Sequence, residues 1–574
     1  MRKPNVVFIL TDDQGYGDLA CTGNPVLKTP HIDRLYEQSV HFTDYHVTPL
    51  CAPTRAGLFT GRCHNSTGVW HTVGGRSLLR SDEVTIADVL KEADYRTGIF
   101  GKWHLGDNYP FRPFDRGFEE CVIHGGGGIG QTNDYWGNDY FDDVYFDKGE
   151  RTRFSGYCTE VWFDLGMEFI SKHKDEPFFC LLTVNAPHQP LYVPERYKNM
   201  YPECTEERAR FNGMITCIDD QLGRLREHLE KLNLADDTLL IYMADNGTVD
   251  GFTWDDDGFA VEGYNAGMRG SKGWSFEGGH RVPFFMHYPN GGMDKARDFD
   301  ELTHYTDVFP TIAELCGAQL PVNRELDGVS LVPYVKTGDA SRLSGRITVT
   351  DIQFVKQPVK WRGNCVMMDK YRLVGSNHLS DISIDPEQRF NIIDKHPEIA
   401  EKLKDGYERW WVKASERFDE EIPIIIGSEI APNVCISSHE WRGNVEDCCC
   451  NQGDIREAKR CNQYAEILVA SAGIYRFTLR RWPEEEKLAI TAGIDGNITW
   501  HTGGKAVPAV KAEISVGDCR AQCKVTGFDE EIVFELLLKE GSAHLQTWFT
   551  SENGEVRGAY YVYVSKVLSG TGVI

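Results

Sequence analysis

Val6-Val7-Phe8-Ile9-Leu10-Thr11-Asp12-Asp13 is an apolar run that ends abruptly in two acids. A continuous apolar run of five residues is typical of a strand that is buried on both faces, and it is too short to cross a membrane. Because strands buried on both faces belong to parallel sheets covered by helices, this stretch predicts an α/β fold. It follows Met1–Asn5 directly, so we interpret it as a buried strand rather than a signal peptide.

The same pattern recurs along the first 320 residues. Three further apolar runs end in polar or charged side chains, and helical patterns lie between the runs. They are Thr97–Phe100 before Gly101-Lys102-Trp103-His104, Phe178–Val184 before Asn185-Ala186-Pro187-His188, and Leu239–Ala244 before Asp245-Asn246-Gly247. We therefore expect a large mixed, mostly parallel sheet flanked by helices. Ligands of such sheets bind beyond the carboxyl ends of the strands, so acids, a lysine and histidines should meet there.

The second half of the chain has a different texture. Strands are expected around residues 346–351 and 371–374, followed by a helix at Pro397–Trp411. Beyond residue 417, short strand-like runs alternate with turn residues, which favours a β-sandwich; the runs are Ile467–Ala470, Gly473–Leu479, Leu488–Ala492 and Tyr560–Val564. The predicted domains are thus 1–335 (α/β, catalytic), 336–416 (a small α+β subdomain) and 417–574 (an accessory β-rich domain).

Composition excludes several classes of function. The 574 residues are 41% hydrophobic and 26% charged, as expected of a globular protein, and the net charge of -25 disfavours binding to nucleic acid or to anionic membranes. No apolar run approaches the length of a membrane span, so no membrane insertion is expected. The 17 cysteines lack the regular spacing of a disulfide framework, which favours free thiols and a cytoplasmic location. The alternative is a periplasmic or secreted protein whose export signal was removed.

One segment carries a long and specific motif. Cys51-Ala52-Pro53-Thr54-Arg55-Ala56-Gly57-Leu58-Phe59-Thr60-Gly61-Arg62 places a cysteine at a loop-to-helix junction, where the helix N-terminus and Arg55 favour an anion. A lone cysteine there would be read as a buried structural residue. The whole segment, however, resembles the signature of formylglycine-dependent sulfatases, which belong to the alkaline-phosphatase-like superfamily. Thr54 stands where Ser is commoner, and the resemblance extends over about residues 4–415.

This resemblance implies how Cys51 would act. In the family the cysteine is oxidised by a formylglycine-generating maturation enzyme, and the hydrated aldehyde supplies one oxygen to attack sulfur and a second to release the sulfate. Arg55 would orient the modified side chain with its fork of donors. The expected cofactors are therefore formylglycine from Cys51 and a metal ion.

Two acidic segments predict that metal ion. Asp12 and Asp13 follow the first strand, and Asp245 and Asn246 follow a distant one. Each pair alone is typical of a solvated turn. Together, three carboxylates and one amide oxygen suit Ca²⁺ better than Zn²⁺. The family places its Ca²⁺ ligands at the matching positions, and residue 51 completes them.

Further motifs of the family supply the remaining catalytic candidates. Gly101-Lys102-Trp103-His104-Leu105-Gly106 matches a segment in which the lysine binds near the sulfate and the histidine takes the proton that starts release of the sulfate from the enzyme. His188 would protonate the leaving oxygen, and Lys272 would hold the sulfate. Glu277–Pro283 and Thr306–Thr311 also match the family and are interpreted as structural. His280 departs from the pattern of its segment, and we expect it within reach of the substrate.

The substrate is the least determined feature. Four aromatic side chains are candidates for stacking on sugar rings, with packing as the alternative: Tyr135, Trp136, Trp254 and Trp274. Trp136 is predicted to bind substrate together with Lys102, His188, Lys272 and His280. Since accessory β-domains are common in carbohydrate-degrading enzymes, the expected substrate is a sulfated sugar of a polysaccharide or glycan. The alternatives are small aryl sulfates, phosphonate monoesters or phosphodiesters, and an inactive protein that only binds glycans.

Overall fold

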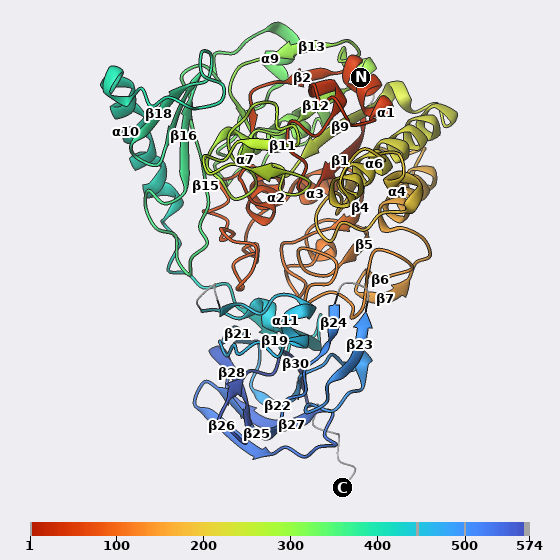
Figure 1. The fold of residues 1–574 in the computed structure, drawn as a ribbon, viewed down its shortest axis with the longest axis vertical. Coiled ribbons are helices and arrows are strands. Elements are labelled where there is room, and N and C mark those ends of the chain that lie inside the picture. The colour runs from red at the N-terminus through yellow and green to blue at the C-terminus, as the bar shows by residue number, and fades with distance from the viewer. Residues whose placement is uncertain (1–2, 444–446, 499–500, 568–574) are drawn as a thin grey trace.

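A computed structural model describes residues 3–443, 447–498 and 501–567 (Figure 1). Within these residues the largest sheet has ten strands, in the order β13 (Arg297–Phe299), β2 (Val40–Phe42), β12 (Phe284–His287), β9 (Thr238–Ala244), β1 (Asn5–Thr11), β8 (Phe178–Thr183), β4 (Arg96–Lys102), β5 (Glu120–His124), β6 (Val144–Asp147) and β7 (Glu150–Arg153). The five central strands, β9 to β5, are parallel, and antiparallel strands flank them. The predicted mixed, mostly parallel α/β sheet is confirmed.

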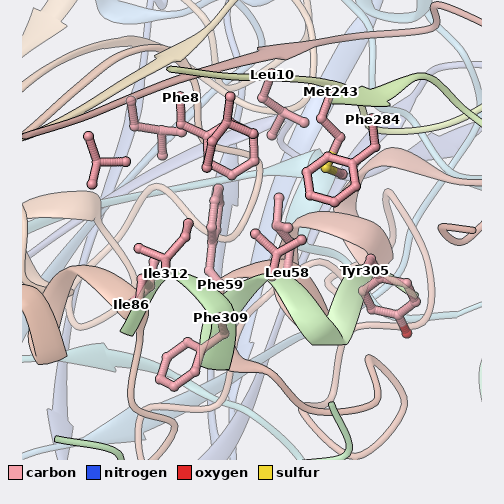
Figure 2. Close-up of a cluster of buried hydrophobic side chains, with 14 of the residues drawn as sticks. Phe8, Leu10, Leu58, Phe59, Ile86, Met243, Phe284, Tyr305, Phe309 and Ile312 are labelled. Atoms are coloured by element: carbon pink, nitrogen blue, oxygen red, sulfur yellow. The ribbon is translucent and has the colours of Figure 1, made fainter. Parts of the chain in front are cut away.

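Strand β1 is buried on both faces, as its apolar run predicted. Val6, Phe8 and Leu10 face one core, which they share with α2 (Cys51–Thr60), α3 (Ile86–Glu92) and α8 (Val308–Cys316), and Figure 2 shows part of it. Val7 and Ile9 face a second core with α1 (Pro30–Glu37), α4 (Cys158–Lys172) and α6 (Glu206–Lys231). Burying each such side chain stabilises the fold by roughly 1.5–3 kcal/mol. The two cores hold the central strands, and hence their carboxyl ends, in fixed register.

A smaller antiparallel sheet follows in the chain. It has the order β15 (Ile347–Asp351), β16 (Asn364–Met368), β17 (Tyr371–Val374) and β18 (His378–Asp381), and α10 (Pro397–Ala414) packs on it around Leu373 and Leu403. The sequence predicted β15, β17 and the helix but missed β16 and β18.

The β-rich part forms two sheets around one shared core, at the bottom of Figure 1. One contains β19 (Ile424–Ile426), β21 (Ala465–Val469), β28 (Gly541–Ser551), β25 (Ala509–Val516) and β26 (Cys519–Lys524), with β29 (Val556–Arg557) paired to β28; the other contains β20 (Asn433–Ser437), β30 (Tyr561–Lys566), β22 (Gly473–Arg480) and β27 (Ile532–Leu538). This is the sandwich that the sequence predicted. The prediction of a strand at Leu488–Ala492 is wrong. The Ala492 carbonyl accepts a hydrogen bond from the Arg481 guanidinium instead of from a neighbouring strand.

Short elements connect these layers: β3 (Tyr45–His46), β10 (Thr253–Trp254), β11 (Ala260–Glu262), β14 (Thr303–His304), β23 (Ile494–Ile498), β24 (His501–Gly504), α5 (Glu195–Lys198), α7 (Glu277–His280), α9 (Val332–Thr337) and α11 (Gln452–Arg456). All 17 cysteines are free thiols, and most are buried. Within the described residues, every helix falls short of the length and apolar character needed to cross a membrane. The domain limits at residues 335 and 416 stay a prediction.

Candidate active site

The carboxyl ends of three central strands bring acidic and basic side chains to one place. Strand β1 ends before Asp12 and Asp13, β9 ends before Asp245, and β4 ends at Lys102. In the sheet, Leu10 of β1 is level with Thr183 of β8 and Met243 of β9, so these strands end at the same edge. Carboxylate oxygens of the three aspartates all lie within 4.8 Å of one another, and all three side chains are buried.

Three cations hold these carboxylates. Lys102 Nζ lies 2.7 Å from Asp12 Oδ2, and Lys272 Nζ lies 2.7 Å from Asp13 Oδ1. Arg55 pairs with Asp245 at 2.8 Å and donates a second hydrogen bond to the carbonyl of Lys102. Burial acts to raise the pKa of Asp13, but Lys272, His188 and Lys102 together outweigh it and the pKa is lowered. Burial also raises the pKa of Asp245, to about 6, and the Asp12 carboxylate adds to that shift.

The oxygen atoms of this cluster fit a hard divalent cation. Asp12 Oδ1 and Asn246 Oδ1 are buried and have no hydrogen-bond partner within the described residues. An unpartnered buried acceptor is costly unless a ligand satisfies it. Asn246 is held in place because its Nδ2 donates to Asp13 Oδ1 at 2.7 Å. Carboxylate and amide oxygens, without a histidine or thiolate among them, match the preference of Ca²⁺.

Cys51 is the first residue of α2 and is buried against this cluster. The free N–H groups at the start of a helix favour negative charge, so α2 offers an electropositive environment to residue 51. Burial nevertheless raises the pKa of the Cys51 thiol, and Lys102 opposes that shift. The Cys51 Sγ atom lies 3.3 Å from His104 Nδ1.

The orientation of His104 defines which ring nitrogen carries its proton. His104 has a left-handed backbone, with φ of 65°, a conformation that costs a non-glycine residue energy and is concentrated at functional sites. Its Nε2 lies 2.9 Å from the carbonyl oxygen of Thr72, which only accepts hydrogen bonds. Nε2 therefore keeps the proton of the neutral ring, and Nδ1 is left as an acceptor facing Cys51. Burial, reinforced by Lys102, lowers the pKa of His104 well below its usual range.

His188 also lies beside the acidic cluster. Its Nδ1 donates to the carbonyl of Gln189 at 2.6 Å, and its Nε2 is 3.7 Å from Asp13 Oδ2. About a fifth of the His188 side chain is exposed, so Nε2 is accessible from outside. Burial lowers the pKa of His188 to about 4, whereas Asp13 acts to raise it. The negative charge of a bound sulfate would act in the same direction as Asp13.

Comparison with known proteins places the chain in a family. The Sulfatase family model matches residues 4–318, which is more than half of the chain. The chain belongs to the sulfatase family. It is 30% identical to human N-acetylgalactosamine-6-sulfatase, over 59% of this chain and 66% of that protein, and 29% identical to mouse arylsulfatase J, over 58% of this chain and 56% of that protein. The chain thus spans less than two thirds of either relative.

Solved structures agree with this assignment. The crystal structure of Ps i-CgsB in complex with k-i-k-neocarrahexaose is similar with a TM-score of 0.65 and 26% identity, over 72% of this chain and 94% of that one. The phosphonate monoester hydrolase of Agrobacterium radiobacter has a TM-score of 0.51 and 20% identity over 72% of this chain and 96% of that one, a likeness in fold alone. The alkaline-phosphatase-like fold expected from the sequence is therefore confirmed.

Two predicted substrate-binding residues of this sulfatase lie away from the cluster. The His280 ring is fully buried, with Nδ1 2.9 Å from His46 Nδ1 and Nε2 3.2 Å from the carbonyl of Ser275. Trp136 is 5% exposed, and its ring packs edge-on against Trp482, 5.5 Å away, in the core of the β-rich part. Both side chains are occupied by protein contacts, so the structure corrects their prediction as substrate ligands. The other predicted catalytic and metal-binding residues form one connected set.

Sequence reasoning missed two further histidines beside the site. The His439 ring, from the β-rich part, lies 6.5 Å from the ring of His104, centroid to centroid. His71 is also buried, and its pKa is lowered to about 3 by burial and by His439. Neither residue belongs to a recognisable motif, and His439 is 335 positions beyond His104 in the chain. No local pattern in the sequence could have found them.

Proposed function

We propose that this protein hydrolyses a sulfate ester on a sugar of a polysaccharide or glycan, with formylglycine at position 51 and one Ca²⁺ ion as cofactors. The observation that carries the proposal is the position of Cys51. The signature cysteine begins a helix, lies within 3.3 Å of His104 and faces a buried cluster of three carboxylates, two lysines and Arg55. A sulfate ester is an anion, and in a chain of net charge -25 only such a local group of cations can bind it.

The substrate class is supported by what relatives are called. The names of several relatives specify N-acetylgalactosamine-6-sulfatase, and Ps i-CgsB was solved with a neocarrahexaose. Mouse arylsulfatase J, at similar identity, keeps aryl sulfates as the alternative. The likeness to the phosphonate monoester hydrolase concerns the fold alone, and sulfuryl and phosphoryl groups share tetrahedral geometry, so phosphonate esters are the competing substrates to test.

The metal would be held by Asp12, Asp13, Asp245 and Asn246, with residue 51 completing its ligands, and it would polarise the reacting oxygen atoms. The chain's own residues have separate tasks. Lys102 and Lys272 neutralise the charge of the sulfate. Arg55 binds both Asp245 and the backbone of Lys102, so it fixes two strand ends relative to residue 51.

The two histidines would move protons at different atoms. His104 presents an unprotonated Nδ1 to residue 51 and can take a proton there. His188 presents Nε2 from the open side of the cluster, where it would donate a proton to the leaving sugar oxygen once the bound anion has raised its pKa. A separate base and acid beside one anion site suit the two halves of ester hydrolysis.

The test is desulfation of defined sulfated monosaccharides by protein in which peptide mass spectrometry shows conversion of Cys51. 4-Nitrophenyl sulfate and phenyl phosphonate esters serve as competing substrates. We expect free sulfate from at least one sulfated sugar, at a kcat/KM above that for the aryl sulfate and the phosphonate. Preference for the phosphonate, or full activity with an intact Cys51 thiol, would overturn the proposal. The maturation enzyme is the expected partner, and co-expression with one should raise the converted fraction.

A further inference from the structure

The carbonyl that orients His104 belongs to a short loop of the sulfatase domain, the region of the family match at residues 4–318, that contacts the β-rich part. His71–Arg76, the orienting loop, contains Thr72, whose oxygen accepts from His104 Nε2 at 2.9 Å. The loop is bent by His71, because its Nδ1 accepts from the backbone N–H groups of Thr72 at 2.7 Å and Val73 at 3.1 Å. The Thr72 carbonyl thus depends on the shape of the whole loop.

The β-rich part holds the far end of the orienting loop. Gly75 N–H donates to the carbonyl of His439 at 3.1 Å, in the turn Ser438–Glu440 that follows β20. Arg76 donates two hydrogen bonds to Glu421, at 3.0 and 3.3 Å, and Arg442 pairs with the same carboxylate at 3.0 Å. Backbone and charge contacts therefore join the loop to residues more than 340 positions away.

The turn itself is fixed from both sides. Glu440 accepts from the backbone N–H of Ser437 at 2.9 Å, which closes the turn. Asn133, from the sulfatase domain, donates to the other Glu440 oxygen at 2.6 Å and accepts from the Ser437 hydroxyl at 2.6 Å. All of these groups are buried or partly buried, so water competes little for their hydrogen bonds.

We propose that the β-rich part is a working component of the active site: its turn Ser438–Glu440 holds the orienting loop so that the Thr72 carbonyl keeps the His104 proton on Nε2 and leaves Nδ1 free toward residue 51. This inference rests on the proposed role of His104. Gly75, Ser437 and Glu440 are thus positioning residues that act through Thr72. A purely structural tether would stabilise the protein but would leave the protonated nitrogen of His104 unchanged.

Two adjacent glycines allow a matched test. Gly75 has φ of 63°, and a Cβ atom there would lie 2.7 Å from the Glu440 carbonyl oxygen, too close unless loop and turn separate. Gly74 has φ of 69°, but the nearest atom to its Cβ would be the Trp441 carbonyl oxygen at 3.7 Å, an ordinary contact. Gly74→Ala and Gly75→Ala therefore carry the same backbone strain, and only Gly75→Ala pushes against the β-rich part.

The main readout is the tautomer of His104, measured by NMR of protein labelled with ¹⁵N-histidine, its signals assigned by their loss in His104→Ala. We expect Gly74→Ala to keep the Nε2-protonated form and Gly75→Ala to show the Nδ1 form or a mixture. Turnover by converted protein should fall in Gly75→Ala by about 10- to 100-fold relative to Gly74→Ala, the usual effect of removing a partner that orients a histidine. KM should change little, because the sulfate-binding lysines are untouched.

Glu421→Gln is a second variant in case Gly75→Ala fails to fold. It keeps the shape of the side chain but removes the charge that Arg76 and Arg442 share, and it should shift the tautomer in the same direction. The inference would be overturned if Gly75→Ala and Glu421→Gln, wherever they fold, kept the Nε2 tautomer of His104 and turned over as fast as Gly74→Ala. Failure of the proposed function is seen separately, as retention of full activity in His104→Ala.

Discussion

Replacing Arg372 by methionine tests the buried charge cluster that joins the four-stranded sheet to the sulfatase domain. Arg372, on β17, is fully buried; its Nη2 lies 2.6 Å from Asp44 Oδ1 and its Nε 2.9 Å from Glu277 Oε1. Methionine fills similar space but removes the cation that both carboxylates share, leaving Glu277 with Arg281 at 3.5 Å and Asp44 with His46 at 2.8 Å. Breaking a buried ion pair in this way costs about 3–5 kcal/mol.

The way in which stability depends on pH should be reversed in the same variant. In the native protein, burial favours the neutral form of Glu277, but Arg372 together with His46, His280 and Arg281 outweighs it and lowers the pKa from 4.5 to about 2. A lowered carboxyl pKa contributes about 3 kcal/mol of stability above pH 4.5, and this contribution is lost as the pH falls toward 2. Because Arg372 is the largest of the opposing charges, we expect burial to prevail in its absence and to raise the pKa of Glu277. The folded protein then holds the proton of Glu277 more tightly than the unfolded chain does. Arg372→Met should therefore become more stable as the pH falls from 7 to 5.

Hydrogen exchange of the backbone amides in residues 364–381 measures the local free energy of opening without requiring two-state unfolding. The control is Arg476→Met, which breaks a surface pair with Glu535 whose side chains are about half exposed; it should cost at most about 1 kcal/mol. The reasoning would be refuted if Arg372→Met lowered the free energy of opening by less than about 1 kcal/mol at pH 7, or if that free energy fell further on acidification to pH 5.

The remaining predictions concern the proposed chemistry. His188→Ala should reduce hydrolysis of sulfated sugars far more than that of 4-nitrophenyl sulfate, whose leaving anion departs unaided, and equal losses on both substrates would contradict the acid role. Exhaustive EDTA treatment, or Asp245→Asn, should lower turnover by more than about 100-fold. The control is an untreated sample of equal melting temperature, and unchanged turnover would exclude the metal site. Cys51→Ser should be inactive when produced in a host that matures only cysteine-type sulfatases, and activity there without an aldehyde in peptide mass spectra would exclude formylglycine.

The sequence predicted most of the sulfatase domain because its signals are local. An apolar run such as Val6–Leu10 must be buried on both faces, and an acid directly after it must lie at the strand's carboxyl end. Parallel pairing then brings Asp12 and Asp245 together although 233 positions separate them. Strands β16 and β18 gave no such signal, since β16 has an apolar run of only four residues, Cys365–Met368, and β18 is short and mostly polar.

The two misplaced residues show where local patterns fail. Trp136 was predicted at the substrate because it is an aromatic residue in a loop, yet Arg456 and Trp482 of the β-rich part cover its ring. His280 was predicted near the substrate because it is an unexpected residue within a motif, yet it contacts His46 beside the Glu277–Arg372 pair. In both cases the deciding partner comes from a distant segment, and one sequence carries no record of that pairing.

The core itself indicates that the β-rich part is not a removable module. Interfaces between independent domains are usually polar, whereas here Leu78, Phe111 and Trp136 of the sulfatase domain belong to the same buried cluster as the two sheets of the sandwich. Separating the parts would expose these side chains and also release the loop that orients His104. Because the family match ends at residue 318, the residues of the β-rich part that share this core and hold this loop, such as Glu421 and His439, lie outside the region by which the family is recognised. Catalysis in this sulfatase would then depend on a segment that the family signature does not contain.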